Sequence, residues 1–315
     1  MTVIAFSFGI KTGLKKSNKY MLSSPCNLCG SSNVKVLFHP DDYPDGYKND
    51  ILRCRQCGLV FRDLAENITL RANGISRTHN RRDYPDKWNM RRLSIFNQGV
   101  KIASGSRKLN RILDIGSGEG FFLNLCLANG WEVFGVEVNS ELVKFTEEMF
   151  GIKVFDGPLE DARFPENHFD VVTFWNVLEH LSAPDTALRE TYRILRPGGC
   201  ILVRFPNATF HVNCRRLFVN AYKFWKGIKR FHYSVIHSYS FNLSTISKYL
   251  RNAGFRFSEL QNWHLRGLPK NSQLFSITEI VEFAVKCAIK ISKMVTMGRC
   301  SIAPSLIVKG IKPLE

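Results

Sequence analysis

The sequence lacks any apolar run of the ~18 to 20 residues needed to cross a bilayer, which excludes a membrane-spanning helix. No lysine or arginine precedes the opening apolar run, residues 3–10, and this order is the reverse of a secretory signal. The chain also lacks internal repeats and low-complexity tracts, and with 44% hydrophobic residues it can bury a core. We therefore expect a folded, cytoplasmic protein.

Acidic residues are scarce in the C-terminal third of the chain. Residues 201–315 hold 4 aspartates and glutamates against 18 lysines and arginines, whereas residues 1–200 hold 23 against 26. Such an asymmetry favours an anionic partner, either nucleic acid, a phosphorylated substrate or a membrane surface. A merely solubilising basic face is the alternative.

Four of the nine cysteines form two C-x-x-C pairs, Cys26/Cys29 and Cys54/Cys57, separated by 24 residues. Two such pairs can place four thiolates tetrahedrally around one zinc ion. A glycine follows each pair and a strand-like run follows each glycine, which is the pattern of a zinc ribbon. Because four protein ligands fill the coordination shell, we expect the zinc to be structural and not catalytic. The strand-like runs are residues 34–38 and 59–61.

From residue 111 onward, strand-like and helix-like segments alternate strictly. This alternation predicts parallel strands joined by crossover helices in a doubly wound α/β sheet. We expect Ser182 to be the N-cap of the helix that has Pro184 and Asp185 in its first turn. The expected strands are residues 111–115, 132–138, 153–155, 169–175 and 200–205. Helices are expected at residues 88–103, before the first strand, and at residues 121–129 and 141–150, between the strands.

The first strand of this sheet runs into the glycine-rich segment LDIGSGEG, residues 113–120. Its three glycines allow the backbone to approach a ligand closely at the carboxyl edge of the sheet. A dinucleotide fingerprint would have its last glycine at position 121, which is Phe, and the Gly-Lys-Ser/Thr ending of a Walker loop is missing. Two acids, Asp114 and Glu137, with no lysine nearby suit a ligand that has a ribose and a cationic head.

Taken in order, the motifs of this half resemble those of the class I S-adenosylmethionine-dependent methyltransferases. The resemblance covers about residues 109–207 and implies a seven-stranded Rossmann-like sheet, S-adenosylmethionine as cofactor and methyl transfer as the reaction. With the ribbon, the layout is similar to methyltransferases of sugar, polysaccharide and small-molecule pathways. The motifs that carry it are LDIGSGEG, GVEV at 135–138, FPENHFDVV at 164–172 and LRPGGCILV at 195–203, with weaker echoes in HSYSF at 237–241 and a closing strand at 305–309.

The resemblance also implies residue roles at the cofactor. Glu137 would bridge the ribose hydroxyls, the glycines would admit the methionine portion, and Asp114 would act through the turn amides or the ammonium group. The position after the third strand, often acidic in the family, is Leu159 here, which leaves the adenine to its backbone or to Asp156 or Asp161. The implied cofactor-binding residues are Asp114, Gly116, Gly118, Gly120, Glu137, Leu159 and Asn176.

The segment WNVLEH, residues 175–180, follows the fourth strand at the edge that would face the cofactor. Asn176 is the expected cofactor or acceptor contact, and Glu179 and His180 are candidate general bases. His237, in a Tyr/Phe-rich stretch, is a further candidate base that would approach from the lid side. A role for His180 in bracing the next helix is the alternative. Because no Asn-Pro-Pro-Tyr-like turn occurs here, a hydroxyl or carbon acceptor is favoured over a nucleic-acid base.

Two segments of the C-terminal third stand out from the methyltransferase pattern. The first interleaves aromatic residues with basic ones, including Arg215, Arg216, Lys229 and Arg230, which could hold a phosphate. The second is an amphipathic helix at about residues 277–295, which either lies on an anionic membrane or packs as a core or dimer helix. The expected division is an N-terminal extension 1–25, a zinc ribbon 26–70, a helical bridge 71–108 and a methyltransferase domain 109–315 with insertions 208–242 and 272–298.

The function that these observations favour is methyl transfer from S-adenosylmethionine to a hydroxyl or carbon of a glycan, a nucleotide- or lipid-linked sugar or a small metabolite, with an anionic acceptor. A ribosomal or transfer RNA methyltransferase is the alternative, because a ribbon on a basic chain also suits RNA. A catalytically silent zinc-bearing binding module is the second alternative. We expect a cytoplasmic location, with peripheral contact to the inner face of the membrane as one option.

Overall fold

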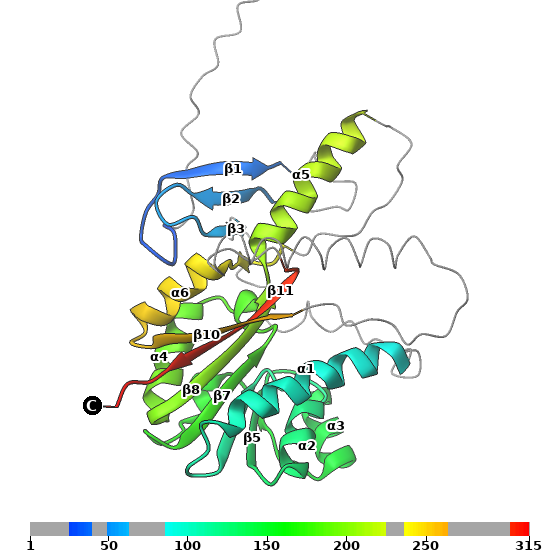
Figure 1. The fold of residues 1–315 in the computed structure, drawn as a ribbon, viewed down its shortest axis with the longest axis vertical. Coiled ribbons are helices and arrows are strands. Elements are labelled where there is room, and N and C mark those ends of the chain that lie inside the picture. Colours follow the sequence, from blue (N-terminus) through cyan, green and yellow to red (C-terminus); the bar gives the residue numbers. More distant parts are fainter. Residues whose placement is uncertain (1–24, 40–48, 63–85, 225–235, 264–302, 315) are drawn as a thin grey trace, which may run out of the picture.

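The computed structural model describes residues 25–39, 49–62, 86–224, 236–263 and 303–314. The described residues form a small four-stranded sheet and a large seven-stranded sheet, stacked along the long axis of the molecule (Figure 1). Within these ranges, no helix combines the length and the apolarity that crossing a membrane requires.

The large sheet has the strand order β10-β11-β8-β7-β4-β5-β6. The strands from β8 through β7, β4 and β5 to β6 pair in parallel, whereas β11 pairs antiparallel with both β8 and β10. The predicted doubly wound, seven-stranded Rossmann-like sheet is therefore confirmed. The strands are β4 Arg111–Ile115, β5 Glu132–Glu137, β6 Phe155–Asp156, β7 Phe169–Trp175, β8 Leu195–Pro206, β10 Arg256–Trp263 and β11 Ser305–Ile311.

Helices cover both faces of the large sheet, and the alternation of side chains along the strands decides which residues meet which helix. Ile112 and Val171 share one core cluster with Phe96 of α1 and Phe122 of α2. Their sequence neighbours on the other face share a second cluster with side chains of α4 and α6. The helices are α1 Asp86–Ser104, α2 Phe121–Ala128, α3 Ser140–Phe150, α4 Pro184–Ile194, α5 Ala208–Phe224 and α6 Leu243–Asn252.

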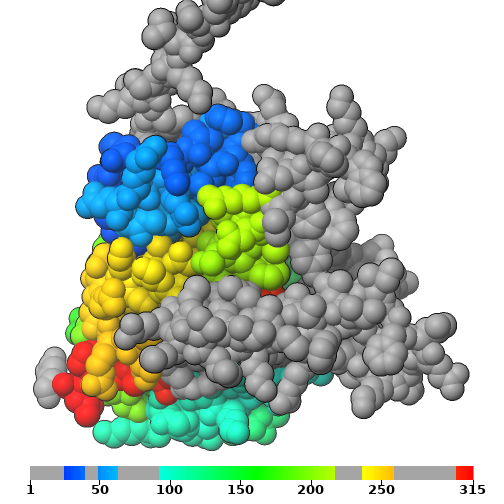
Figure 2. Space-filling view, turned by 45° about the horizontal axis from the view of Figure 1, so that its top comes forward, coloured from blue at the N-terminus to red at the C-terminus, as the bar shows by residue number. Residues whose placement is uncertain are grey.

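The small sheet joins the two C-x-x-C segments to the rest of the chain. Its strands are β1 Val34–Phe38, β2 Ile51–Cys54 and β3 Val60–Arg62, and its fourth strand, β9 Tyr239–Ser240, comes from the C-terminal third. β3 and β9 pair antiparallel, with Phe61 opposite Tyr239. In Figure 2 this blue sheet rests on α6, in yellow, and on α5, in yellow-green.

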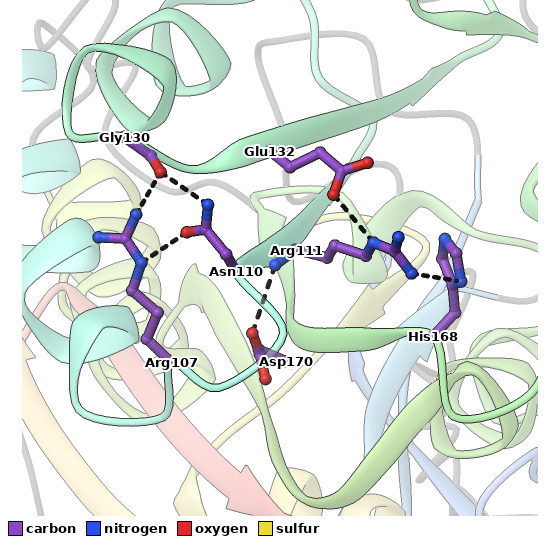
Figure 3. A network of polar contacts seen from close by, with 7 residues as sticks. All are labelled: Arg107, Asn110, Arg111, Gly130, Glu132, His168 and Asp170. Atoms are coloured by element: carbon purple, nitrogen blue, oxygen red, sulfur yellow. Dashed lines mark hydrogen bonds and ion pairs between the residues drawn. The ribbon is translucent and has the colours of Figure 1, made fainter.

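The amino ends of the strands are tied together by a polar network (Figure 3). Arg107 and Asn110 both donate to the carbonyl oxygen of Gly130, with Asn110 Nδ2 at 2.9 Å. The backbone N–H of Arg111 donates to Asp170 Oδ2 at 3.3 Å, which links β4 to β7. Because this edge is closed by its own side chains, the carboxyl edge remains for ligands.

Two predictions about local structure need correction. The N-cap of α4 is Ala183, not Ser182, and no side chain caps this helix. Pro184 opens the helix, and because proline has no N–H and a fixed φ it starts a helix without a polar cap. The third strand is Phe155–Asp156, later than predicted. The amphipathic helix expected at 277–295 lies outside the described residues.

Candidate functional site

The turn after β4 is built from three left-handed glycines, Gly116, Gly118 and Gly120, with φ of 66°, 57° and 72°. A Cβ on Gly116 would lie 2.6 Å from the side chain of Val177, and one on Gly120 would lie 2.4 Å from that of Thr146. A Cβ on Gly118 would meet nothing within 4 Å. The outer glycines therefore allow close packing within the protein, while Gly118 borders open space at the carboxyl edge.

Glu137, the last residue of β5, fixes this turn. Its Oε2 accepts from the backbone N–H of Gly118 at 2.9 Å, and its Oε1 accepts from those of Val138 and Asn139 at 2.9 and 3.0 Å. Because a carboxylate offers about four acceptor sites, three are filled and about one is left, on Oε2. Glu137 is 8% exposed, and the acceptor site left on Oε2 is available to a ribose hydroxyl, while the bridge to both hydroxyls stays a prediction.

Asp114, near the end of β4, is buried at 2% exposure and accepts a hydrogen bond from Thr173 Oγ1 at 2.6 Å. Burial is the main cause that raises the pKa of Asp114 to about 8, and the negative charge of Glu137 adds to it. A cationic ligand at this edge would favour the ionised carboxylate. The expected role toward an ammonium group stays a prediction, and the described hydrogen bond of the Asp114 side chain goes to Thr173 instead of the turn amides.

The same edge of the sheet also offers a buried hydroxyl, a backbone turn and two exposed acids. The Oγ of Ser117, between the glycines, is buried and has no hydrogen-bond partner among the described residues. The side chain of Leu159 is 4% exposed and packs in the core, so only its backbone, in the 3₁₀ turn Leu159–Ala162, can face an adenine. Asp156 and Asp161 are exposed beside it.

The three candidate bases converge at the carboxyl end of β7. Glu179 and His180 lie in the 3₁₀ turn Leu178–His180, and His237 lies just before β9. One carboxylate oxygen of Glu179 and one ring nitrogen of each histidine all lie within 4.8 Å of one another. The two imidazole rings are in edge contact, with their centroids 4.1 Å apart. The structure thus brings together residues that are more than fifty positions apart in the sequence.

Electrostatics keep both imidazoles neutral near neutral pH. Part of the His180 side chain is exposed, but desolvation by the groups packed around its ring and the positive charge of Arg62 lower its pKa. Burial, His180, Arg62 and His211 together lower the pKa of His237 to about 3. Arg62 is the last residue of β3, where its backbone N–H donates to Ser238 at 3.0 Å and its guanidinium donates to Ile236, so it holds the chain on both sides of His237.

Glu179 is 1% exposed, and burial raises its pKa to about 8. A carboxylate and two imidazoles can in general hold a divalent metal. Here the positive charge of Arg204 acts on Glu179, and that of Arg62 acts on both histidines. Positive charge opposes a cation and favours an anion, so proton transfer next to an anionic group suits this cluster better than metal binding.

Asn176 has a left-handed backbone, with φ of 59°, at the point where β7 ends. Its N–H donates to the carbonyl oxygen of Arg204 at 2.9 Å, and its Oδ1 accepts from the Arg204 guanidinium. The side-chain NH₂ of Asn176 is the group left to contact a cofactor or an acceptor. Sequence reasoning did not find Arg204, because an arginine inside a buried apolar strand has no motif around it.

The four ribbon cysteines form a second cluster, remote from Asn176 in the sequence. The Sγ atoms of Cys26 and Cys57 are 3.6 Å apart, as are those of Cys29 and Cys54, and all four lie within 4.8 Å of one another. Sulfurs at ~2.3 Å from a tetrahedral zinc ion are about 3.8 Å apart. The glycines that follow the two pairs have positive φ, as the predicted turns require.

The basic segment after β8 is only partly available for an anionic ligand. Arg215 is 4% exposed, and its guanidinium lies 5.7 Å from the ring centroid of Phe38 in β1. It therefore packs between α5 and the ribbon and is not part of an exposed basic surface, and its contact to a phosphate stays a prediction. Arg216 is exposed. Lys229 and Arg230 lie outside the described residues.

Three comparisons place this site among known proteins. A family model described as a methyltransferase domain matches residues 78–260, more than half of the chain. The chain is similar to the ubiquinone/menaquinone biosynthesis C-methyltransferase UbiE of Azotobacter vinelandii, with 31% identity over 110 residues. The same enzyme of Pseudomonas paraeruginosa is 35% identical over 111 residues. Each match covers 32% of this chain and less than half of the relative, 44% and 43% respectively.

Solved structures with a similar fold include a SAM-dependent methyltransferase from Archaeoglobus fulgidus. It has a TM-score of 0.49 and 21% identity, over 70% of this chain and 94% of that one. An S-adenosylmethionine-dependent methyltransferase from Mesorhizobium loti has a TM-score of 0.44 and 14% identity, over 67% and 96% of the two chains.

Proposed function

The chain belongs to the family of methyltransferase domains, class I enzymes that use S-adenosylmethionine, and from this premise we propose that it methylates a carbon or hydroxyl oxygen of a small metabolite. The observation that carries the proposal is the shared edge of the sheet. The glycine turn follows β4 and Glu137 ends β5. Glu179 and His180 follow β7, which pairs directly with β4, and His237 meets them there. Cofactor and base are thus neighbours along the carboxyl ends of adjacent strands.

The residues of the glycine turn would bind the cofactor, which supplies a methyl group on a positively charged sulfur. Glu137 would accept one ribose hydroxyl on its free acceptor site while its other sites keep the turn closed. The open space at Gly118 and the unpartnered Ser117 hydroxyl would border the methionine portion. The backbone of Leu159 would face the adenine, and Asn176 would lie toward the methyl group.

We assign the proton acceptor to His180. A neutral imidazole can accept the proton that an acceptor carbon or hydroxyl loses as it attacks the methyl group. His237, with a pKa of about 3, is too weak a base at neutral pH, and it packs against His180 and adds to the positive surroundings that keep both rings neutral. Glu179, protonated at neutral pH, would position His180 rather than accept a proton there.

For the acceptor class, the similarity to ubiquinone/menaquinone biosynthesis C-methyltransferases supports carbon methylation in a small metabolite rather than a glycan. RNA as the acceptor rests on the basic composition alone, and Arg215 no longer contributes to an exposed basic surface. We also propose that the four ribbon cysteines hold one structural zinc ion, which the 3.6 Å sulfur spacings support.

Binding of S-adenosylmethionine is expected to fail when Glu137 is replaced by alanine. The substitution removes one hydrogen bond to the glycine turn, two to the backbone amides that follow β5, and the ribose contact, and each charge-assisted bond contributes about 1.5 to 3 kcal/mol. We expect an affinity loss of about 100-fold or more in isothermal titration calorimetry. Glu132→Ala is the matched control, because this glutamate starts the same strand with an exposed side chain. A wild-type chain that does not bind S-adenosylmethionine would favour the silent binding module.

Replacing Arg62 by glutamine is expected to raise the pKa of His180 and of His237. The arginine's positive charge disfavours the protonated form of both rings, so its removal lets each ring keep a proton at a higher pH. Methyl transfer would then lose its base earlier as the pH falls. Titration of the histidine ring signals by NMR measures the shift. Arg55→Gln, an exposed change on the same ribbon, should leave both rings unchanged, and an equal shift in both variants would contradict the assignment.

A further inference from the structure

Arg204 is a half-buried cation without an ion-pair partner in the described part of the chain. It stands on β8 directly opposite Trp175 of β7. One of its terminal nitrogens donates to Asn176 Oδ1, and the other lies 3.4 Å from Ser305 Oγ. Its Nε is buried and has no hydrogen-bond partner among the described residues. A guanidinium whose Nε is buried and whose other described contacts are neutral oxygens gains from an anion that completes its contacts.

The nearest described acid, Glu179, does not complete them. The two groups attract each other electrostatically, yet they are not within the 4.0 Å of an ion pair, and both oxygens of Glu179 also lack a partner. Unpartnered polar atoms of opposite character thus lie close together at one end of β7 and β8. A polar group between them would satisfy the Arg204 Nε and the Glu179 carboxyl together.

The position of Arg204 along the sheet edge separates it from the cofactor end. Following the strand order β5-β4-β7-β8, the edge presents Glu137, then the glycine turn, then Asn176 and then Arg204. Arg92 pairs with Glu119 of the glycine turn at 3.0 Å, so the glycine turn has a cation of its own. Arg204 lies beyond Asn176, on the side where the acceptor would stand.

We propose that Arg204 binds an anionic oxygen of the acceptor, either the oxyanion of a phenol or enol or a carboxylate. This inference rests on the proposed methyl transfer and names the chemical class of the acceptor for that site. When a phenol or enol acceptor gives its proton to His180, negative charge forms on its oxygen and Arg204 stabilises it, whereas a carboxylate binds Arg204 already ionised. The electron pair of the acceptor carbon or oxygen then forms the bond to the methyl group, while the carbon–sulfur bond breaks and its electrons stay on sulfur as neutral S-adenosylhomocysteine.

The experiment uses 4-nitrophenol as the probe, because its ionised form absorbs visible light. The full chain is saturated with S-adenosylhomocysteine, and the ionisation of bound 4-nitrophenol is followed by absorbance against pH. In the wild type the ionisation should move toward lower pH by about one unit, a tenfold preference for the anion. Arg204→Gln should abolish this shift, and Arg204→Lys, which keeps a charge without the planar fork, should keep part of it. Arg251→Gln, an exposed change on α6, should keep all of it.

Each result decides a separate question. Calorimetry with S-adenosylhomocysteine should give the same affinity for wild type and Arg204→Gln within about twofold, whereas a loss of more than about tenfold would assign Arg204 to the cofactor carboxylate and overturn the proposal. Equal shifts in Arg204→Gln and Arg251→Gln, or no shift in the wild type, would also overturn the proposal. Water between Arg204 and Glu179 would then be the partner of their polar atoms. If Arg204→Gln does not fold, Arg204→Lys decides alone. Failure of the wild type to bind S-adenosylhomocysteine would reject the proposed function itself.

Discussion

Asp114→Asn is expected to stabilise the folded chain at pH 8, whereas Asp170→Asn is expected to destabilise it. Both side chains are buried in the same sheet, with exposures of 2% and 0%. Asparagine at position 114 still accepts from Thr173 but removes a charge that burial disfavours. Asparagine at position 170 removes the partner of Arg196 and leaves that guanidinium unpaired. We expect a gain of about 3 kcal/mol in the free energy of unfolding for the first and a loss of about 3 kcal/mol for the second.

The pH dependence of the free energy of unfolding should run in opposite directions for Asp114 and Asp170. The pKa of Asp114 rises from 3.8 in the unfolded chain to about 8, so the folded state binds more protons between these values and its stability falls as the pH rises. The advantage of Asp114→Asn should therefore be absent below pH 4 and largest above pH 8. The Arg196 side chain and backbone N–H groups lower the pKa of Asp170, so its contribution is present at neutral pH and is lost on acidification. Urea unfolding at pH 5 and pH 8 measures both, and a destabilised Asp114→Asn at pH 8 would contradict the argument.

A buried carboxyl that lowers the stability of the fold is expected at the cofactor edge if it serves the function of the protein. S-adenosylmethionine carries a positive sulfur and an ammonium group, and positive charge favours the ionised form of Asp114. Asp114→Asn should thus weaken cofactor binding while it strengthens the fold. The Asp114→Asn variant should therefore combine a higher free energy of unfolding with a lower affinity for S-adenosylmethionine.

The fold could be predicted wherever short-range pattern decided the structure. The strands β4 and β7 match their predicted bounds because each is a short, mainly apolar segment between turn residues, as buried parallel strands are. The glycine turn was found because its spacing and its left-handed backbone belong to a local motif. The cysteine pairs were found for the same reason.

What the sequence did not reveal depends on contacts between distant segments. β9 has only two residues, Tyr239 and Ser240, and it becomes a strand because β3 of the ribbon pairs with it. Arg215 has the composition of a surface residue, yet the ring of Phe38 covers it. The prediction of Ser182 as the N-cap of α4 failed because Pro184 starts this helix without a capping side chain. Glu179, His180 and His237 were each candidate bases, but their meeting at one point follows from β9.

Cys54→Ser is expected to lose the zinc ion and to destabilise the methyltransferase domain together with the ribbon. Cys54 is 1% exposed, and the ribbon residues Cys26, Leu52 and Phe61 belong to the same core cluster as side chains of β7 and β8. Tyr249 of α6 donates to Asn27 at 2.7 Å across this contact. Because metal binding supplies much of the folding free energy of small ribbons, about 10 kcal/mol or more, its loss should remove the support for β9. Metal analysis should find about one zinc per chain in the wild type and none in the variant.

The control for this change is Cys126→Ser, which alters an equally buried cysteine in α2, outside the ribbon. It should keep its zinc and lose only the stability that a buried hydroxyl costs. In Cys54→Ser the NMR signals of His237 should change, since β3 and Arg62 hold the chain on both sides of that residue. Binding of S-adenosylmethionine should persist as long as the large sheet is folded, because Glu137 and the glycine turn lie on β5 and β4, away from β9. A Cys54→Ser chain that retains its full zinc content would refute the site, and one that loses zinc without any change at His237 would refute the link between the ribbon and the proposed base.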